Sequence, residues 1–255
     1  MSEELLKLQK IYKNFGNVKV LKDVNIKINK GEVVALIGDN GAGKSTLIKV
    51  ITGVHKPSSG EVFFNGEEVV IKSVSQSRKM GIEAVYQERA LCDQQELWRN
   101  IFAGREITNS FGFLDIKKQR KEAEKILRDY IGFTSKAITV DSIITGLSGG
   151  EKQGVAFGRS LYFDSDLIVL DEPTMGLSIQ ETEKVLNFVK GLKKKNKSAI
   201  FIDHNIIHVY GAADRFIILD RGEVVGEFNK DEISREELVQ KMIQLHESGK
   251  IKVEA

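Results

Sequence analysis

The segment of this 255-residue sequence most suggestive of chemistry is a glycine-rich octapeptide. It reads Gly38-Asp39-Asn40-Gly41-Ala42-Gly43-Lys44-Ser45. This matches the pattern G-x-x-x-x-G-K-[S/T], in which glycines let successive backbone N–H groups point at the oxygens of a phosphate. An apolar run precedes it and a helix-like run follows it, as this pattern requires. We therefore predict a phosphate-binding loop, in which Lys44 reaches the β- and γ-phosphates of a nucleotide and Ser45 binds Mg²⁺.

A second apolar run, 167–170, ends in two acids, Asp171 and Glu172. Doubly wound sheets bind their ligands at the carboxyl ends of parallel strands, which is where these carboxylates would lie. Asp171 is suited to holding Mg²⁺ directly or through water, whereas Glu172 points elsewhere and could polarise an attacking water. Acids often merely end a strand, but beside a phosphate loop the pair indicates nucleotide hydrolysis.

Short apolar runs bounded by Gly or Asp predict the strands that must position these residues. Runs 5–9 and 24–28 alternate like half-buried strands, and the Asn65-Gly66 pair within 60–70 predicts a hairpin. Continuous apolar runs predict central strands at 33–37, 167–170 and 199–202.

Patterns with a period near 3.6 predict helices after the strands. They cover 45–51, 115–130, 150–161, 179–195, 206–212 and 234–245. Strands that alternate with helices favour an α/β fold with a parallel sheet. The stretch between Gln87 and Leu147 lacks a strong strand signal and is interpreted as a helical insert.

Composition narrows the class of protein. With 38 Lys and Arg against 36 Asp and Glu, the net charge of +2 does not indicate a nucleic-acid partner. The single cysteine, Cys92, excludes an intramolecular disulfide and fits a reducing compartment. The apolar runs fall short of the roughly 20 residues that a membrane span needs, so we expect no span in this sequence.

The segment Leu147-Ser148-Gly149-Gly150-Glu151-Lys152-Gln153 resembles the LSGGQ-type signature of ABC ATPases, with Glu151 in place of the usual glutamine. The order of phosphate loop, Gln87, signature, Asp-Glu pair and His204 is also similar to that family over nearly the whole chain. The chain is therefore identified as an ABC nucleotide-binding domain. The resemblance implies one domain over 1–255: a P-loop NTPase core with a mixed, mainly parallel sheet, an antiparallel β flank, and a helical subdomain inserted at about 88–147.

The resemblance also implies a role for individual residues. Catalysis would use Glu172 as the general base, His204 as the switch histidine at the γ-phosphate, and Gln87, which approaches Mg²⁺ and links the core to the insert. Ser45, Gln87 and Asp171 would hold Mg²⁺. The residues expected to bind ATP are Phe15, Gly38, Asn40, Gly41, Gly43, Lys44, Ser45, Thr46, Ser148, Gly149 and Gly150.

The signature is expected to act on a second subunit, and the role of Phe15 has an alternative. Ser148, Gly149 and Gly150 begin a helix, and their N–H groups and hydroxyl would form an anion site for the γ-phosphate held by a second subunit. Phe15 is expected to stack on adenine, with a core phenylalanine as the alternative. His55, His208 and His246 match no family motif and are expected to be surface or packing residues.

The segment after Asp171-Glu172 departs from the family. The resemblance implies a D-loop that ends in S-A-L-D, whereas this chain has Ser178 at the final position. The aspartate that reaches across the dimer is therefore replaced. We expect hydrolysis to persist, with altered coupling between subunits.

The segment 100–106, Asn-Ile-Phe-Ala-Gly-Arg-Glu, resembles the monosaccharide-import branch of ABC transporters. We expect an ATPase that powers import of a sugar or similar solute through transmembrane permease subunits, at the inner face of the cell membrane, with a solute-binding protein in the complete system. A single copy implies a head-to-tail pair with itself or a sister subunit. An exporter ATPase and a non-transport ABC ATPase remain the alternatives.

The helical insert, around 91–132, is expected to contact the permease. Leu97, Trp98, Ile101 and Phe102 would line an exposed groove there, or alternatively form the core of the insert.

Overall fold

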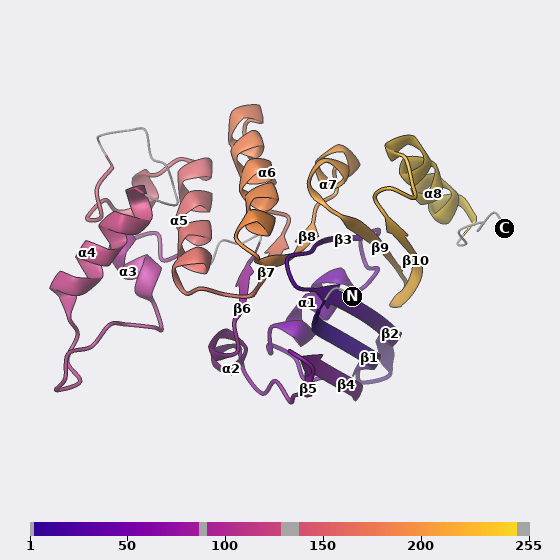
Figure 1. The fold of residues 1–255 in the computed structure, drawn as a ribbon, viewed down its shortest axis with the longest axis horizontal. Helices are drawn as coiled ribbons and strands as arrows, with labels where there is room; N and C mark the ends of the chain where they lie inside the picture. The colour runs from indigo at the N-terminus through magenta and orange to yellow at the C-terminus, as the bar shows by residue number, and fades with distance from the viewer. Residues whose placement is uncertain (1–2, 87–90, 129–137, 249–255) are drawn as a thin grey trace.

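The computed structural model describes residues 3–86, 91–128 and 138–248 (Figure 1). Its strands are β1 (Glu4–Phe15), β2 (Val18–Asn29), β3 (Val33–Ile37), β4 (Ser59–Phe64), β5 (Glu67–Glu68), β6 (Ile82–Val85), β7 (Leu167–Asp171), β8 (Ser198–Ile202), β9 (Arg215–Asp220) and β10 (Glu223–Asn229). Its helices are α1 (Lys44–Ile51), α2 (Val74–Lys79), α3 (Leu97–Phe102), α4 (Ile116–Ile126), α5 (Gly149–Tyr162), α6 (Ile179–Lys194), α7 (Ile206–Ala212) and α8 (Arg235–Ser248), with a 3-10 turn at Ile144–Gly146.

The larger sheet has the strand order β10-β9-β3-β8-β7-β6, and all of its pairs are parallel except β9 with β10. Every residue of β3 and β8 is buried, which confirms the prediction of central strands covered on both faces. The fold is therefore the predicted α/β arrangement. The strands β6, β9 and β10, which complete both edges of this sheet, were not among the strands predicted from the sequence.

The smaller sheet is antiparallel and has the order β2-β1-β4-β5. Buried residues alternate with less buried ones along much of β1 and β2, as the sequence predicted, although both strands are longer than the predicted runs. Between β4 and β5 the backbone takes positive φ at Asn65 (52°) and Gly66 (80°), which confirms the predicted tight turn.

Two hydrophobic cores lie on opposite faces of the larger sheet. One fills the space between the two sheets, where Leu47 and Ile48 of α1 pack among residues of β1, β2 and β3. The other lies beneath α6, α7 and α8, with Val189 and Leu238 against β3, β8 and β9. Figure 1 shows these three helices along one side of the sheet and α1 on the other, toward the antiparallel strands. The strand edge that carries the predicted site is held between these layers.

A third core joins α3, α4 and α5 into the helical subdomain seen at one end of the molecule (Figure 1). The expectation that α3 residues line an exposed groove is wrong. Leu97, Trp98, Ile101 and Phe102 are all at most 3% exposed, because α3 packs against α4 and α5 and both of its sides are covered. These residues are the core of the insert, which was the alternative.

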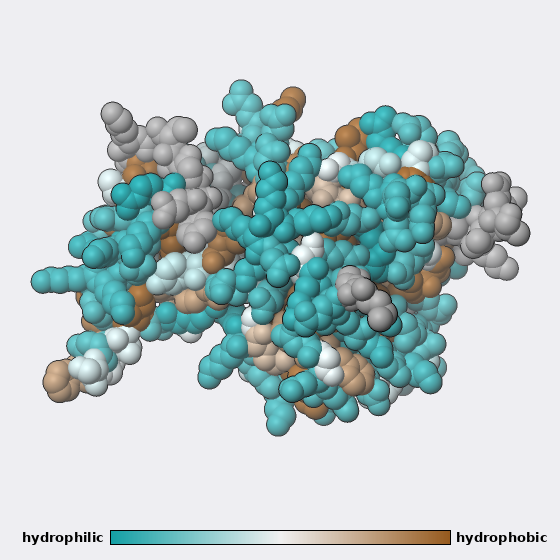
Figure 2. Space-filling model, in the orientation of Figure 1, coloured by the Kyte–Doolittle hydropathy of each residue, from teal (hydrophilic) through white to brown (hydrophobic). Residues whose placement is uncertain are grey.

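The most exposed apolar side chains of this subdomain lie instead on the loop between α3 and α4. Phe111 is 85% exposed and Phe113 is 72% exposed. The Asn109 side chain accepts hydrogen bonds from the backbone N–H groups of both, at 3.0 and 3.1 Å, and so holds the turn. Figure 2 shows an apolar tip at the end of this projecting loop. Among the described residues, no helix has the length and apolarity to cross a membrane.

A buried charge cluster connects the core to the helical subdomain. Glu83 of β6 is 1% exposed and forms ion pairs with Arg78, 3.2 Å away, and with Arg105, which follows α3. Arg159 of α5 is 5% exposed, and burial, reinforced by the nearby charge of Arg78, lowers its pKa to about 10. One buried carboxylate thus pairs with two guanidinium groups in a region of low dielectric, with the buried Arg159 close to Arg78.

We predict that Glu83→Ala lowers the free energy of unfolding by about 3 kcal/mol or more, because it leaves buried guanidinium groups without their counter-charge. Urea unfolding measures this change. The control is Glu223→Ala, which removes an exposed pair with Lys22 at 3.6 Å and should cost less than about 1 kcal/mol. Equal effects of the two substitutions would contradict the account of the cluster.

Candidate functional site

The predicted phosphate loop lies at the carboxyl end of β3 and leads directly into α1. Gly43 precedes α1 with φ of 107°, a conformation that strongly favours glycine, and a Cβ there would lie 3.0 Å from the Leu21 side chain. A Cβ at Gly38 would lie 2.2 Å from the carbonyl oxygen of Leu219. The curved backbone at Gly43 and the close packing at both positions explain why glycine stands there. Asn40, Gly41 and Ser45 are exposed in this segment.

Lys44 folds its side chain back over this loop. Its ammonium donates to the carbonyl oxygens of Gly38 at 2.6 Å and Asp39 at 3.0 Å, and the residue is only 8% exposed. Burial lowers the pKa of Lys44, against the opposing charges of Glu172, Asp171 and Asp39. A buried ammonium held by neutral carbonyls can exchange them for phosphate oxygens, so the loop fits a nucleotide chemically.

The two predicted acids follow each other at the end of β7. Burial and the neighbouring Glu172 raise the pKa of Asp171, whereas Lys44, Lys49 and His204 act in the opposite direction. Among the described residues, no group of three or more His, Cys, Asp and Glu could hold a metal by itself. Ser45 and Asp171 nevertheless fit Mg²⁺, because such sites use one or two protein oxygens together with substrate phosphates.

Glu172 and His204 come from adjacent strands and meet at the sheet edge. His204 Nε2 and Glu172 Oε1 lie 2.7 Å apart. Glu172 has φ of 50°, which is costly for a residue with a side chain, and its N–H donates to the Ile202 carbonyl at 2.9 Å. The strained backbone therefore aims this carboxylate at the imidazole, and a carboxylate so placed can take a proton from water.

A second hydrogen-bond network, which the sequence did not reveal, lies next to this pair and connects the loops that follow β7 and β8. Thr174 bonds to the Asp203 carboxylate, and Asp203 accepts from the N–H of Asn205 at 2.8 Å. His208 Nδ1 lies 3.3 Å from Thr174 Oγ1 and 3.4 Å from Asp203 Oδ2. This network fixes the loop after Glu172 to the loop that carries His204. His208 thus packs against site residues, and its position four residues after His204 was the available signal.

The signature residues are joined to α6. Ser148 caps α5, and its N–H donates to Glu151 Oε2 at 2.7 Å in a capping box. The N–H of Gly150 donates to Glu181 Oε1 at 2.9 Å. Within the described residues, no hydrogen bond links this helix start to the phosphate loop, whose lysine bonds to its own carbonyls. In the part of the chain that the structure describes, the signature and the phosphate loop therefore each bond within their own surroundings.

The remaining predicted residues lie as follows. Phe15 ends β1 and is 43% exposed, so it is not the core residue of the alternative interpretation. Its ring meets His55 edge-on at 5.2 Å. His246 of α8 lies 3.3 Å from Asp39 of the phosphate loop, a contact that the sequence did not predict. Gln87 lies outside the described residues.

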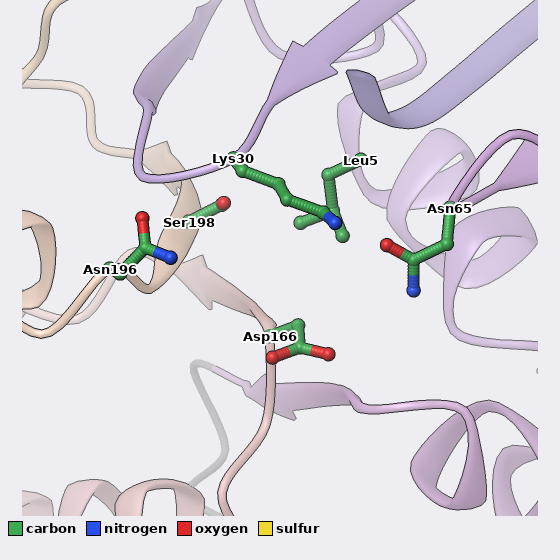
Figure 3. Close-up of a pocket in the computed structure, with 6 residues that line it drawn as sticks. All are labelled: Leu5, Lys30, Asn65, Asp166, Asn196 and Ser198. Atoms are coloured by element: carbon green, nitrogen blue, oxygen red, sulfur yellow. The ribbon is translucent and has the colours of Figure 1, made fainter. Parts of the chain in front are cut away.

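A cavity of about 280 Å³ lies elsewhere in the molecule (Figure 3). It lies at the amino ends of the parallel strands, opposite the edge with the acids. Lys30 pairs there with Glu3 at 2.5 Å, and the Ser198 hydroxyl bonds to backbone groups of Asn29 and Gly31. Because these polar groups are already satisfied and ligands bind at carboxyl ends of parallel strands, the cavity does not compete with the phosphate loop.

Residues 21–175 match the family model described as ABC transporter. The chain is 45% identical to the xylose/arabinose import ATP-binding protein XylG of Sulfolobus acidocaldarius, over 94% of each chain.

Two further relatives extend the comparison. The chain is 37% identical to the ribose import ATP-binding protein RbsA of Caldanaerobacter subterraneus, over 94% of this chain and 48% of that protein, so it spans about half of such relatives. A solved dimeric ATP-binding cassette, in a post-hydrolysis state with ADP and Pi, is 26% identical, with a TM-score of 0.75 over 89% of this chain and 99% of that one.

We predict that Lys44→Met weakens ATP binding roughly 10- to 100-fold, because it removes charge-assisted hydrogen bonds to the phosphates. Titration calorimetry measures the affinity, and Lys184→Met on the exposed face of α6 is the matched control. ATP affinity that is the same in both variants would refute the phosphate-loop assignment.

Proposed function

Because the chain belongs to the ABC transporter family of ATP-binding proteins, we propose that it hydrolyses ATP to power import of a monosaccharide. The observation that carries the hydrolytic part is the pairing of Glu172 with His204, 2.7 Å apart, at the strand edge that carries the phosphate loop. The sugar-import part rests on relatives whose names state import of xylose, arabinose or ribose.

Binding would begin with the exchange of ligands around Lys44. The ammonium leaves the carbonyls of Gly38 and Asp39 and contacts the β- and γ-phosphates, while the N–H groups of the loop and of the α1 N-terminus face the same oxygens. The exposed ring of Phe15 would stack on adenine. Ser45 and Asp171 would hold Mg²⁺, which neutralises phosphate charge when bound.

Hydrolysis would use the carboxylate of Glu172 as the base. It accepts a proton from water as the water oxygen bonds to the γ-phosphorus and the bond to the leaving ADP oxygen breaks. His204 keeps the carboxylate oriented and is half exposed, so it can also contact the γ-phosphate. The Thr174–Asp203–His208 network holds both loops in place during this step.

A second chain would complete the site. Ser148, Gly149 and Gly150 would bind the γ-phosphate held by the partner, so ATP binding closes a head-to-tail pair and loss of the γ-phosphate reopens it. The dimeric cassette with ADP and Pi supports this arrangement. Ser178, in place of the usual aspartate, caps α6 within a capping box, which leaves its hydroxyl engaged in its own chain.

The energy would be used by membrane permease subunits. The names of the relatives describe import ATP-binding proteins, which supports permease partners, a place at the inner face of the membrane, and a solute-binding protein on the other side. Because the apolar residues of α3 are buried, they are not available to contact the permease. The exposed apolar surface of the helical subdomain that would make this contact is the loop with Phe111 and Phe113. An exporter subunit is the second candidate.

We predict that Glu172→Gln lowers kcat for ATP hydrolysis about 100-fold or more and leaves ATP affinity nearly unchanged, because the variant keeps the shape but not the basicity of the side chain. A phosphate-release assay and nucleotide titration separate the two quantities. Glu183→Gln, an exposed change on α6, should leave both at the wild-type values. A variant at position 172 that retains full kcat would remove Glu172 from the mechanism.

Uptake in cells tests the transport assignment. Deletion of the chain should reduce uptake of at least one labelled pentose or hexose to background, and the wild-type chain should restore it whereas Glu172→Gln should not. Unchanged uptake of every monosaccharide, together with accumulation of another solute inside the cells, would favour the exporter.

A further inference from the structure

The carboxylate of Glu181, in the first turn of α6, receives hydrogen bonds from two different helix starts. Its Oε2 accepts from the N–H of Ser178 at 3.0 Å and from the Ser178 hydroxyl at 2.9 Å. Its Oε1 accepts from the N–H of Gly150 at 2.9 Å and lies 3.4 Å from the Ser148 hydroxyl. One carboxylate therefore bridges the start of α6 and the signature at the start of α5.

A helix cap does not require the contacts that Glu181 makes with the start of α5. In the capping boxes of α5 and α8, the carboxylates of Glu151 and Glu237 bond to Ser148 and Ser234, within their own helix starts. Glu181 has the same local bonds but adds donors from a helix start 31 residues away. The fit is close, since a Cβ at Gly150 would lie 2.4 Å from Glu181 Oε1. Glycine at 150 thus admits an anion, and here the anion is a side chain of the same chain.

Hydrogen bonds keep this carboxylate charged. The backbone N–H and the hydroxyl of Ser178 lower the pKa of Glu181, with smaller contributions from Gly150 and Ser148. A negative group thereby occupies donors that face a negative ligand in the proposed mechanism, namely Gly150 N–H and the Ser148 hydroxyl. The Glu181 carboxylate and a γ-phosphate cannot accept from the same donors at once. Their like charges would also repel each other at so short a separation.

We propose that Glu181 is a stand-in anion that occupies the signature of the free chain until the γ-phosphate of a second chain displaces it. The inference rests on the proposed function, because it takes that phosphate as the competing ligand. In the free chain the carboxylate satisfies Gly150 and holds the signature helix against α6. On closure it keeps its Ser178 bonds and releases the signature donors, so it sets how much ATP is needed to bring two chains together.

The same contact makes Glu181 a positioning residue between two loops of the site. Ser178 lies six residues after Glu172, at the end of the segment that Thr174 anchors to Asp203. Displacement of the Glu181 carboxylate from Gly150 therefore changes the restraint on the start of α6, next to the loop that carries the base.

The test measures ATP-driven pairing in a Glu172→Gln background, where hydrolysis does not dissolve the pair. Adding Glu181→Gln removes the charge and keeps a side chain able to cap α6, so the Mg-ATP concentration for half-maximal dimer should fall roughly 3- to 10-fold. Adding Glu237→Gln, the matched change in the α8 capping box, should leave it unchanged. An unchanged or raised midpoint for Glu181→Gln would overturn the proposal.

Amide hydrogen exchange at Gly150 in the nucleotide-free chain tests the contact without any pairing. Exchange should accelerate several-fold in Glu181→Ala and stay at the wild-type rate in Glu237→Ala; equal rates for Glu181→Ala and wild type would overturn the contact. If the Glu172→Gln protein never pairs with Mg-ATP, the proposed site between two chains is overturned, and the stand-in role of Glu181 with it. Slow exchange at Gly150 would still verify the contact with Glu181. The two failures are therefore distinguishable.

Discussion

The neighbouring order β3-β8-β7 in a parallel sheet is the constraint on which the site depends. Parallel strands end at the same edge, so residues that follow these strands must meet there even though they are far apart in sequence. The phosphate loop follows β3, Asp171 and Glu172 end β7, and His204 follows β8. Cores on both faces hold the strands in this order, and the strands β6 and β10 form the two edges of the sheet.

The charged and hydrogen-bonding groups that are predicted to bind ATP are held by contacts within the chain itself. Lys44 is buried on its own loop, and the charges of three nearby carboxylates, Glu172, Asp171 and Asp39, oppose the lowering of its pKa by burial. The signature is likewise satisfied internally, by Glu181. Both halves of the proposed site thus bind parts of their own chain in the free state. ATP and a second chain would replace these internal contacts, which makes closure dependent on nucleotide.

The local sequence pattern correctly predicted the strands and helices that flank the candidate site. The bounds of β3 and α7 agree with the structure, because apolar runs and glycine punctuation are local signals. The character of α3 was not predictable in this way, since an apolar six-residue helix looks the same whether it is a groove or a core. Contacts across the fold, such as Glu181 with Gly150 or His208 with Thr174, depend on packing that no local pattern encodes. The role of each predicted site residue remains a prediction.

The central claim is that two copies of this chain share each nucleotide. Light scattering of Glu172→Gln with Mg-ATP, with Mg-ADP and without nucleotide tests it most directly. The account predicts twice the 28.5 kDa mass of one chain with Mg-ATP alone, because only the γ-phosphate joins the phosphate loop of one copy to the signature of the other. A protein that binds Mg-ATP yet keeps the mass of a single chain at every concentration would contradict it.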